Sequence, residues 1–276
     1  MSECTSCSAN ESCTRDKEKC QVVSNSFSNI KKTIGVMSGK GGVGKSTVAV
    51  SIAKQLKKMG YQVGILDADI TGPSVPRLLG LQEERALNSE EYILPVESSE
   101  GIRTMSLNFL IEEENSPVIW RGPAVSNVVK QFYTDVFWGD LDYLVIDMPP
   151  GTSDVALTVM QSILLDGVIM VTLPQDMVSM IVSKAVNMAR TLEIPVLGVI
   201  ENMSYISCPD CGKRISLFGE GNSDQLLYGL QLELLGELPM MKEVAKLSAE
   251  LEESESEVID SLFGPIVEKI IKAVDR

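Results

Sequence analysis

Histidine is absent from this 276-residue chain, and its absence removes several classes of chemistry. No histidine can act as a general acid or base, and no metal site can contain an imidazole ligand. A transition-metal site would therefore have to rest mainly on cysteine thiolates. Six cysteines are present. They form two groups, Cys4, Cys7, Cys13 and Cys20 near the start of the chain and Cys208 and Cys211 in its last third.

Long apolar runs are also missing. The strongest candidate, residues 163–173, is too short for a membrane helix and contains Asp166. The N-terminus carries polar and cysteine residues where a signal peptide needs an apolar stretch. The formal net charge of −14 argues against a general nucleic-acid surface. We therefore expect a cytoplasmic protein that binds neither membrane nor nucleic acid, and in a reducing cytoplasm clustered cysteines indicate metal rather than disulfides.

The first 30 residues have no hydrophobic periodicity and are rich in Ser, Asn, Cys and charged residues. This composition predicts a flexible Cys-rich tail that orders only around a ligand. Residues 31–276 then alternate short apolar runs with helical patterns. Nearly continuous apolar runs are typical of parallel strands covered on both faces. The sequence therefore predicts an α/β domain with a doubly wound, mostly parallel sheet and helices on both faces.

The segments predicted to be strands are residues 33–37, 62–66, 142–146, 167–173 and 195–200. Helices are predicted near residues 45–59, 124–134, 153–164 and 179–192. A last helix, over 258–274, has an apolar face formed by Ile259, Leu262, Ile266, Ile270 and Val274. A membrane-binding amphipathic helix would carry a polar face rich in Lys and Arg, whereas this one mixes acidic and basic residues. We expect its apolar face to pack in the core.

A phosphate-binding loop, GKGGVGKST, follows a predicted strand directly and opens a predicted helix. Its glycines allow successive backbone N–H groups to turn toward one anion. Lys45 is expected to contact the β- and γ-phosphates of a nucleotide, and the Ser46 hydroxyl to hold Mg²⁺. The predicted nucleotide-binding residues of this loop are Gly39, Lys40, Gly41, Gly42, Val43, Gly44, Lys45, Ser46 and Thr47.

Aspartates follow two of the predicted strands, at the edge where an open α/β sheet places its ligand. Asp67 and Asp69 belong to ILDADITGPS, and Asp147 belongs to LVIDMPPG. Asp147 is placed like a Walker B carboxylate and could bind Mg²⁺ through water. One of Asp67 and Asp69 could orient the water that attacks the nucleotide.

The loop contains a second lysine, Lys40, and KGGVGKST resembles the deviant Walker A loop of the MinD, Mrp and nitrogenase-iron-protein class of P-loop ATPases. The resemblance implies a homodimer in which Lys40 reaches across a two-fold interface to the partner's nucleotide phosphates, in the manner of an arginine finger. It further implies that Asp69 activates water, that Asp67 lies in the switch region near Mg²⁺ and that Asn202 recognises adenine. The catalytic residues would then be Lys40, Lys45 and Asp69.

Cys208 and Cys211 form a C-x₂-C pair, a spacing that lets two thiolates share one metal or cluster. A four-cysteine site needs two more ligands, and this half of the chain contains no other cysteine. A symmetric dimer would supply the missing pair from its second copy. Four thiolates fit Zn²⁺ or a [4Fe–4S] cluster equally well by count, so the spacing leaves both open.

Several motifs beyond the phosphate loop are similar to those of the Mrp/Nbp/ApbC family of iron–sulfur cluster carrier ATPases. They are RGP (121–123), DMPPGTSD (147–154), TLPQDM (172–177), GVIENMSY (198–205), CPDCG (208–212) and LFGEG (217–221). The likeness extends over nearly everything from Lys31 onward. It implies a slow ATPase that uses ATP and Mg²⁺, whose C-x₂-C pair binds a labile [4Fe–4S] cluster between subunits. The cluster would pass to apo-proteins.

Scaffold members of that family carry an N-terminal four-cysteine motif that ends C-x₂-C-x₅-C. Cys4, Cys7 and Cys13 match that ending, whereas Cys20 follows these three instead of preceding them. We predict that the N-terminal cysteines bind a second iron–sulfur cluster.

Three other functions share parts of this pattern. A spatial regulator of the MinD or ParA type has the same loop, but it needs a basic membrane helix or a basic DNA surface, and the sequence shows neither. A zinc-bridged ATPase dimer fits the cysteine spacing. A reductase subunit like the nitrogenase iron protein would place its cluster cysteines far apart, unlike Cys208 and Cys211.

Overall fold

The computed structural model describes residues 24–70, 72–89, 91–111, 122–177, 180–208, 210–216, 223–241 and 253–275. Its strands are β1 (Asn29–Ser38), β2 (Val63–Asp67), β3 (Leu87–Asn88), β4 (Ile93–Leu94), β5 (Val96–Glu97), β6 (Arg103–Met105), β7 (Asp140–Asp147), β8 (Gly167–Thr172), β9 (Val196–Ser207), β10 (Arg214–Ser216) and β11 (Leu234–Pro239). One large sheet has the order β10–β9–β8–β1–β7–β2–β6–β5, and β11 pairs with β9 beside this path. Every pair from β9 to β6 is parallel, and only the outer strands β10 and β5 join antiparallel.

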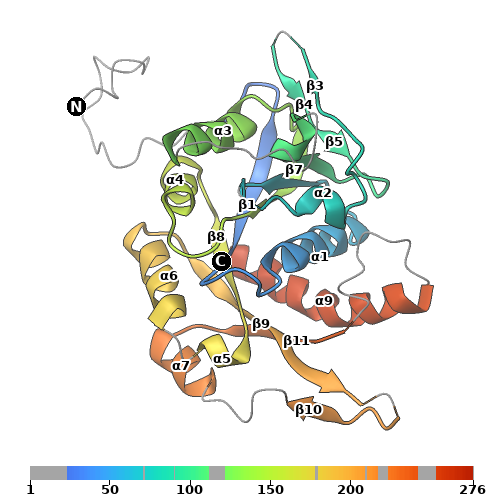
Figure 1. Ribbon diagram of the computed structural model, residues 1–276, viewed down its shortest axis with the longest axis vertical. Coiled ribbons are helices and arrows are strands. Elements are labelled where there is room, and N and C mark those ends of the chain that lie inside the picture. The colour runs from blue at the N-terminus through green and yellow to red at the C-terminus, as the bar shows by residue number, and fades with distance from the viewer. Residues whose placement is uncertain are drawn as a thin grey trace.

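Helices cover both faces of this sheet (Figure 1). They are α1 (Lys45–Lys58), α2 (Val75–Leu78), α3 (Gly122–Thr134), α4 (Asp154–Ser162), α5 (Pro174–Met177), α6 (Met180–Thr191), α7 (Ser223–Leu230) and α9 (Glu253–Val274). One apolar core lies between the sheet and α1, α2 and α9, and a second lies between the sheet and α3, α4, α6 and α7. The predicted doubly wound α/β fold is confirmed.

Helix α9 lies beside α1 and β11 (Figure 1). Its apolar side chains belong to the core on that side of the sheet. Ile266 and Ile270 are buried, Leu262 is partly buried, and Phe263 adds an aromatic ring to the same core. The expected role of this helix in core packing is confirmed. Among the described residues, no helix combines the length and apolar character that crossing a bilayer requires.

Strand β9 is longer than predicted, because it continues past Ile200 to Ser207. Its last residues pair with β10 in a hairpin at the bottom of Figure 1. The apolar run ends at Glu201 and Asn202, which are polar residues buried within the strand. Sequence hydropathy therefore missed the extension.

The first described residues lie against the connection between α3 and β7. The Asn25 side-chain amide donates hydrogen bonds to the carbonyl oxygens of Thr134 (2.9 Å) and Val136 (2.7 Å). The Ser28 hydroxyl donates to the same Val136 oxygen. Strand β1 begins directly afterwards at Asn29, close to the expected start of the domain near residue 31. Cys4, Cys7, Cys13 and Cys20 lie outside the described residues.

Candidate nucleotide site and cysteine turn

The phosphate loop occupies the connection between Ser38, the last residue of β1, and Lys45, the first of α1. Gly42 and Gly44 both have φ of +80°, a left-handed conformation that side chains disfavour. A Cβ atom on Gly41 or Gly42 would meet nothing within 4 Å, so the loop opens onto free space there. That space is a cleft of about 350 Å³, lined by most of the loop and by residues that follow β2 and β7.

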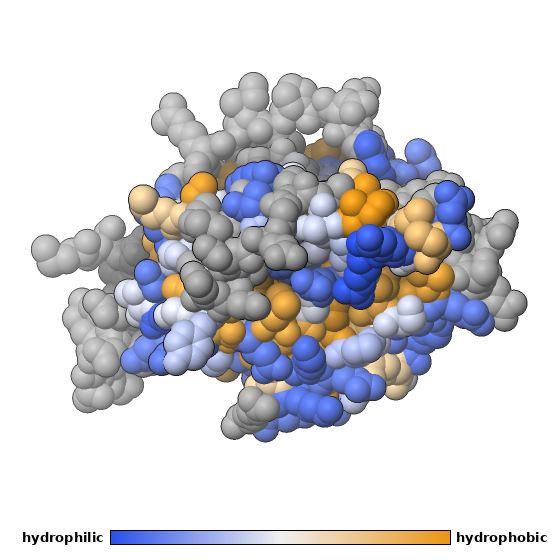
Figure 2. Space-filling view, turned by 90° about the horizontal axis from the view of Figure 1, so that it is seen from below, coloured by the Kyte–Doolittle hydropathy of each residue, from blue (hydrophilic) through white to orange (hydrophobic). Residues whose placement is uncertain are grey.

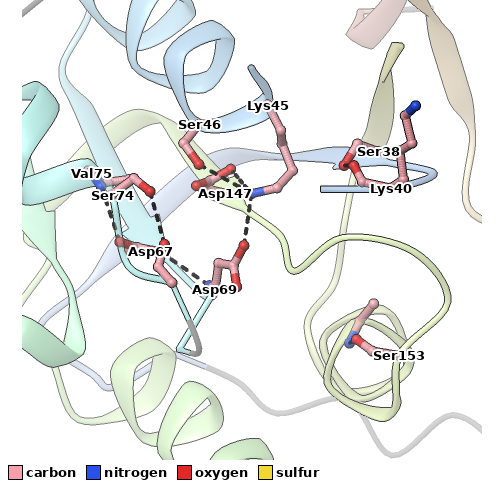
Figure 3. A network of polar contacts seen from close by, with 12 residues as sticks. Ser38, Lys40, Lys45, Ser46, Asp67, Asp69, Ser74, Val75, Asp147 and Ser153 are labelled. Atoms are coloured by element: carbon pink, nitrogen blue, oxygen red, sulfur yellow. Dashed lines mark hydrogen bonds and ion pairs between the residues drawn. The ribbon is translucent and has the colours of Figure 1, made fainter. Parts of the chain in front are cut away.

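Lys45 lies at the centre of the polar groups in this cleft (Figure 3). Its Nζ atom is 2.5 Å from Oδ1 of Asp147 and 3.5 Å from Oδ2 of Asp69. The Ser46 hydroxyl accepts a hydrogen bond from the same nitrogen over 3.4 Å. Asp67 is the register partner of Asp147 on the neighbouring strand. The structure thus brings Lys45, Ser46, Asp67, Asp69 and Asp147 together at the carboxyl edge of the sheet.

Asp67 is fully buried, and its carboxylate is held by three donors. Its Oδ2 accepts hydrogen bonds from the Ser106 hydroxyl (3.2 Å) and the Val75 backbone N–H (3.3 Å), and Oδ1 accepts one from the Asp69 N–H (3.2 Å). Burial and the nearby charge of Asp147 raise the pKa of Asp67 to about 8. Ser106 was not predicted, because it follows a three-residue strand far from Asp67 in the chain and belongs to no motif.

The residues around Lys45 fit a magnesium ion. Oδ2 of Asp147 is buried and accepts no hydrogen bond within the described part of the chain. Burial also raises the pKa of Asp147, although the ion pair with Lys45 opposes that shift. Three carboxyl groups therefore share one ammonium group, and a divalent cation would favour their ionised forms. Mg²⁺ keeps several waters, so Ser46, Asp147 and Asp67 would suffice as protein ligands in its first or second shell.

Lys40 does not join this group. It is exposed at the cleft, and its side chain points away from Lys45 (Figure 3). Its carbonyl oxygen accepts a hydrogen bond from the Ser38 hydroxyl (2.9 Å). The Gly151 N–H donates to the Ser38 carbonyl (2.7 Å), which joins the DMPPGTSD loop to the phosphate loop.

Asn202 lies behind the phosphate loop and is not among the residues that line the cleft. Its side-chain amide donates a hydrogen bond to the Val43 carbonyl (2.9 Å), and its Oδ1 accepts one from the Met203 N–H (3.0 Å). A Cβ atom on Gly44 would overlap the Asn202 amide nitrogen, so the two residues are in close contact. Asn202 therefore braces the loop, a role that the motif did not indicate. Its adenine contact stays a prediction.

The two later cysteines lie in the turn between β9 and β10, hereafter the cysteine turn (residues 208–213). The Cys208 N–H donates to the Lys213 carbonyl (3.0 Å), and the Gly212 N–H donates to the Cys208 carbonyl (2.9 Å). Gly212 has φ of +68°, which glycine adopts without strain. Backbone N–H groups of Cys211 and Asp210 bond the Cys208 sulfur and hold the pKa of that thiol below its usual range. The conformation of the turn therefore favours the thiolate form of Cys208.

Each chain offers only this pair of thiols among its described residues. Cys208 is partly exposed, Cys211 is exposed, and both are free. No group of three or more Cys, Asp or Glu side chains in the described ranges is arranged to hold a metal ion. A metal or cluster bound at the cysteine turn therefore needs ligands from elsewhere.

A glycine-rich loop between a strand and a helix, with a lysine, a hydroxyl and buried carboxylates around its cleft, defines a P-loop nucleotide-binding protein. Residues 29–275 match the family model ParA, described as NUBPL iron-transfer P-loop NTPase. The chain belongs to this family, in agreement with the resemblance of its motifs.

Relatives of similar length carry one common name. An iron-sulfur cluster carrier protein of Clostridium perfringens is 48% identical over 254 residues, which cover 87% of this chain and 89% of that protein. A protein of the same name from Methanocaldococcus jannaschii is 44% identical over 243 residues, covering 86% of this chain and 84% of that protein.

Two solved structures illustrate the structural likeness. A nucleotide-binding protein from Archaeoglobus fulgidus, in complex with ADP, has a TM-score of 0.71 and 43% identity, covering 79% of this chain and 86% of its own. MinD from Pyrococcus furiosus has a TM-score of 0.57 and 17% identity, covering 88% of this chain and 99% of its own. At that identity the likeness to MinD concerns the fold alone.

Proposed function

We propose that this protein is an ATP-dependent iron–sulfur cluster carrier. It acts as a homodimer, binds a [4Fe–4S] cluster as cargo between its two copies, and passes the cluster to apo-proteins in the cytoplasm. The family description and the names of the relatives support the general role. The site geometry supports two separate roles, in which the phosphate loop binds ATP and the cysteine turn binds the cluster.

The cargo site is the cysteine turn. Cys208 and Cys211 from each copy supply four thiolates when two turns meet on a two-fold axis. Backbone N–H groups already stabilise the Cys208 thiolate, and the exposed position of Cys211 leaves the cargo accessible to a recipient. Accessibility suits a carrier, because a closed and buried site would suit a structural metal.

ATP is the substrate of the phosphate loop, with Mg²⁺ as cofactor. Lys45 binds the β- and γ-phosphates once they replace its contacts with Asp147 and Asp69. Ser46, Asp67 and Asp147 would hold Mg²⁺, which would supply positive charge to neutralise the phosphates, and Asp69 would orient the attacking water. Lys40, whose side chain points away from Lys45 of its own chain, completes the partner's site. Hydrolysis is slow in this arrangement, because each ATP site is complete only when the second copy supplies its Lys40.

The N-terminal cysteines form a second cluster site in this proposal. Cys4, Cys7, Cys13 and Cys20 supply four thiolates from one chain, so that site would need no partner copy. The acidic net charge of −14 supports a carrier without nucleic-acid partners.

The observation that carries the proposal is the shape of the cysteine turn, which orients backbone N–H groups toward the Cys208 sulfur on a strand tied to the phosphate loop. The test is anaerobic reconstitution with iron and sulfide, followed by absorption and Mössbauer spectra. Cys208→Ala is expected to lose the interfacial cluster and keep Mg-ATP binding, with Ser207→Ala as the matched control. Undiminished cluster content in Cys208→Ala, or tightly held zinc in the unmodified protein, would overturn the proposal.

A further inference from the structure

An arginine outside the phosphate loop also lines the nucleotide cleft. Of the described residues that line the cleft, Lys40, Lys45 and Arg77 carry cationic side chains. Only Leu78 and Pro150 among them have apolar side chains. By contrast, the face of the molecule seen from below gathers apolar side chains in a band across its middle (Figure 2). A polar cleft with three cations fits a polyanion, so each of these cations is a candidate phosphate ligand.

Arg77 belongs to the short helix α2, which the core and a carboxylate hold in place. Val75 and Pro76 are buried, and Val75 belongs to the core between the sheet and α1. The Val75 N–H donates a hydrogen bond to Oδ2 of Asp67 over 3.3 Å (Figure 3). Arg77 follows two residues later and is exposed at the cleft. Because the ring of Pro76 fixes one of its backbone angles, α2 presents Arg77 from a rigid base.

The sheet order places α2 on the side of the cleft where a terminal phosphate would lie. Strand β7 lies between β1 and β2, so the phosphate loop after β1 faces the connection after β2 across the end of β7. Lys45, whose ammonium group contacts the β- and γ-phosphates in such loops, has its Nζ 3.5 Å from Oδ2 of Asp69 in that connection. A bound γ-phosphate would therefore lie between Lys45 and the segment that carries both Asp69 and Arg77.

We propose that Arg77 binds the γ-phosphate of ATP and makes the cleft selective for a nucleoside triphosphate over the diphosphate. The inference rests on the ATP-binding part of the proposed function. In that function Lys40 serves the partner's site, which leaves Lys45 and Arg77 to the phosphates of their own chain. Lys45 already contacts two carboxylates, at 2.5 and 3.5 Å, so a second cation would offset the extra negative charge of the third phosphate. A planar guanidinium also offers two parallel N–H groups to one phosphate.

Calorimetric titration of the full chain tests this selectivity, with Mg-ADP and with the Mg²⁺ complex of adenylyl-imidodiphosphate, an ATP analogue that resists hydrolysis. Arg77→Ala is expected to bind the analogue at least tenfold more weakly, with Mg-ADP binding changed less than twofold, because ADP has no third phosphate. Arg77→Lys keeps the charge but loses the paired N–H groups, so its affinity for the analogue should lie between those of Arg77→Ala and the unmodified chain.

The matched control is Arg85→Ala. The Arg85 guanidinium donates to the carbonyl oxygens of Gln82 and Glu84, and Arg85 is not among the described residues that line the cleft. This variant removes the same charge from a nearby exposed position. It should bind both nucleotides like the unmodified chain.

Two results would overturn the inference. In the first, Arg77→Ala binds the analogue as tightly as the unmodified chain does. In the second, Arg77→Ala loses affinity for both nucleotides by the same factor, as expected if Arg77 only shapes the cleft. Urea unfolding of the nucleotide-free variant verifies folding, and Arg77→Gln replaces Arg77→Ala if folding is lost.

Cluster content separates this inference from the proposed function. If Arg77→Ala keeps its affinity for the analogue while Cys208→Ala loses the cluster, the assignment of Arg77 is wrong and the carrier function stands. If Arg77→Ala loses its selectivity but the unmodified chain takes up no cluster, the assignment stands and the carrier function is wrong.

Discussion

The side-chain amide of Asn202 donates a hydrogen bond to the Val43 carbonyl across 2.9 Å in the protein interior. Asn202 belongs to β9, and the same strand reaches the cysteine turn six residues later. One continuous strand therefore contacts the phosphate loop at one point and carries the thiols at its end. A strand held in a sheet is stiff. A displacement of the phosphate loop on nucleotide binding would therefore be transmitted along β9 to the cysteine turn.

Replacing Asn202 tests this connection. Asn202→Ala leaves the Val43 carbonyl without its donor, and an unsatisfied buried polar group costs about 1–3 kcal/mol. We expect a lower free energy of unfolding by that amount and roughly tenfold weaker Mg-ATP binding, since about 1.4 kcal/mol is tenfold in affinity. Urea unfolding and calorimetric titration measure the two effects. Asn187→Ala, an exposed position on α6, is the control. Unchanged Mg-ATP affinity in Asn202→Ala would show that the hydrogen bond from Asn202 to Val43 does not hold the phosphate loop in its binding conformation.

Alanine substitutions at two glycines in the left-handed backbone conformation can separate the stability cost of backbone strain from the cost of steric overlap. Gly60 has φ of +96° and open space around it, whereas Gly44 has φ of +80° and a Cβ there would overlap the Asn202 amide. Gly60→Ala is expected to cost about 1–2 kcal/mol, from backbone strain alone. Gly44→Ala should cost at least about 1 kcal/mol more and should lose nucleotide binding. Urea unfolding of the two variants makes the comparison, and equal losses would contradict the tight contact between Gly44 and Asn202.

Because the pKa of Asp67 is raised, we expect the stability of the nucleotide-free, metal-free protein to depend on pH. This pKa of about 8 lies above the ordinary value of 3.8, so between these values the folded state holds a proton that the unfolded chain releases. The free energy of unfolding should therefore fall as pH rises through this window, by up to about 1.4 kcal/mol per pH unit from this group. Asp67→Asn should flatten the slope.

The control for this slope is Asp142→Asn. A hydrogen bond from Lys31 holds the pKa of Asp142 below its ordinary value, so Asp142 acts at lower pH and should leave the slope in place. Urea unfolding at several pH values within the window measures all three proteins. A slope equally steep in Asp67→Asn would locate the titrating group elsewhere.

Lys40 is expected to act in the partner's site, and mixing inactive chains tests this. Lys40→Ala should bind Mg-ATP normally and lose hydrolysis, and Asp69→Asn should also lose hydrolysis. A mixed dimer contains one intact site, because the Asp69→Asn chain supplies Lys40 to the chain that retains Asp69. Phosphate release should therefore reappear on mixing. No recovery would place Lys40 in its own site, and Lys45→Ala, which should lose Mg-ATP binding, provides the inactive reference.

Much of this architecture was predictable from the sequence, because the central strands and their helices bury apolar residues on both sides. The convergence of Asp67 and Asp147 also followed from sequence, since both end parallel strands and such ends share one edge. The small outer strands were not predicted. Strand β10, for example, has three exposed residues, and its position depends on pairing with β9.

The specific hydrogen-bond partners of the site side chains were also not predicted from the sequence. C-x₂-C spacing indicated a ligand pair, but the turn's N–H contacts with the Cys208 sulfur depend on backbone conformation at Gly212. Asn202 could be assigned only by family resemblance, and its bond to Val43 joins residues 159 positions apart. Contacts at such separations leave no trace in local periodicity.

The most direct measurement is native mass spectrometry of the reconstituted protein under anaerobic conditions, with Cys4, Cys7, Cys13 and Cys20 all replaced by serine. With only Cys208 and Cys211 left, we expect a species of two chains that carries a single [4Fe–4S] cluster, and this species should disappear in the additional Cys208→Ala variant. A single chain that holds the full cluster, or a dimer whose central atom is zinc, would contradict a cluster shared between two copies.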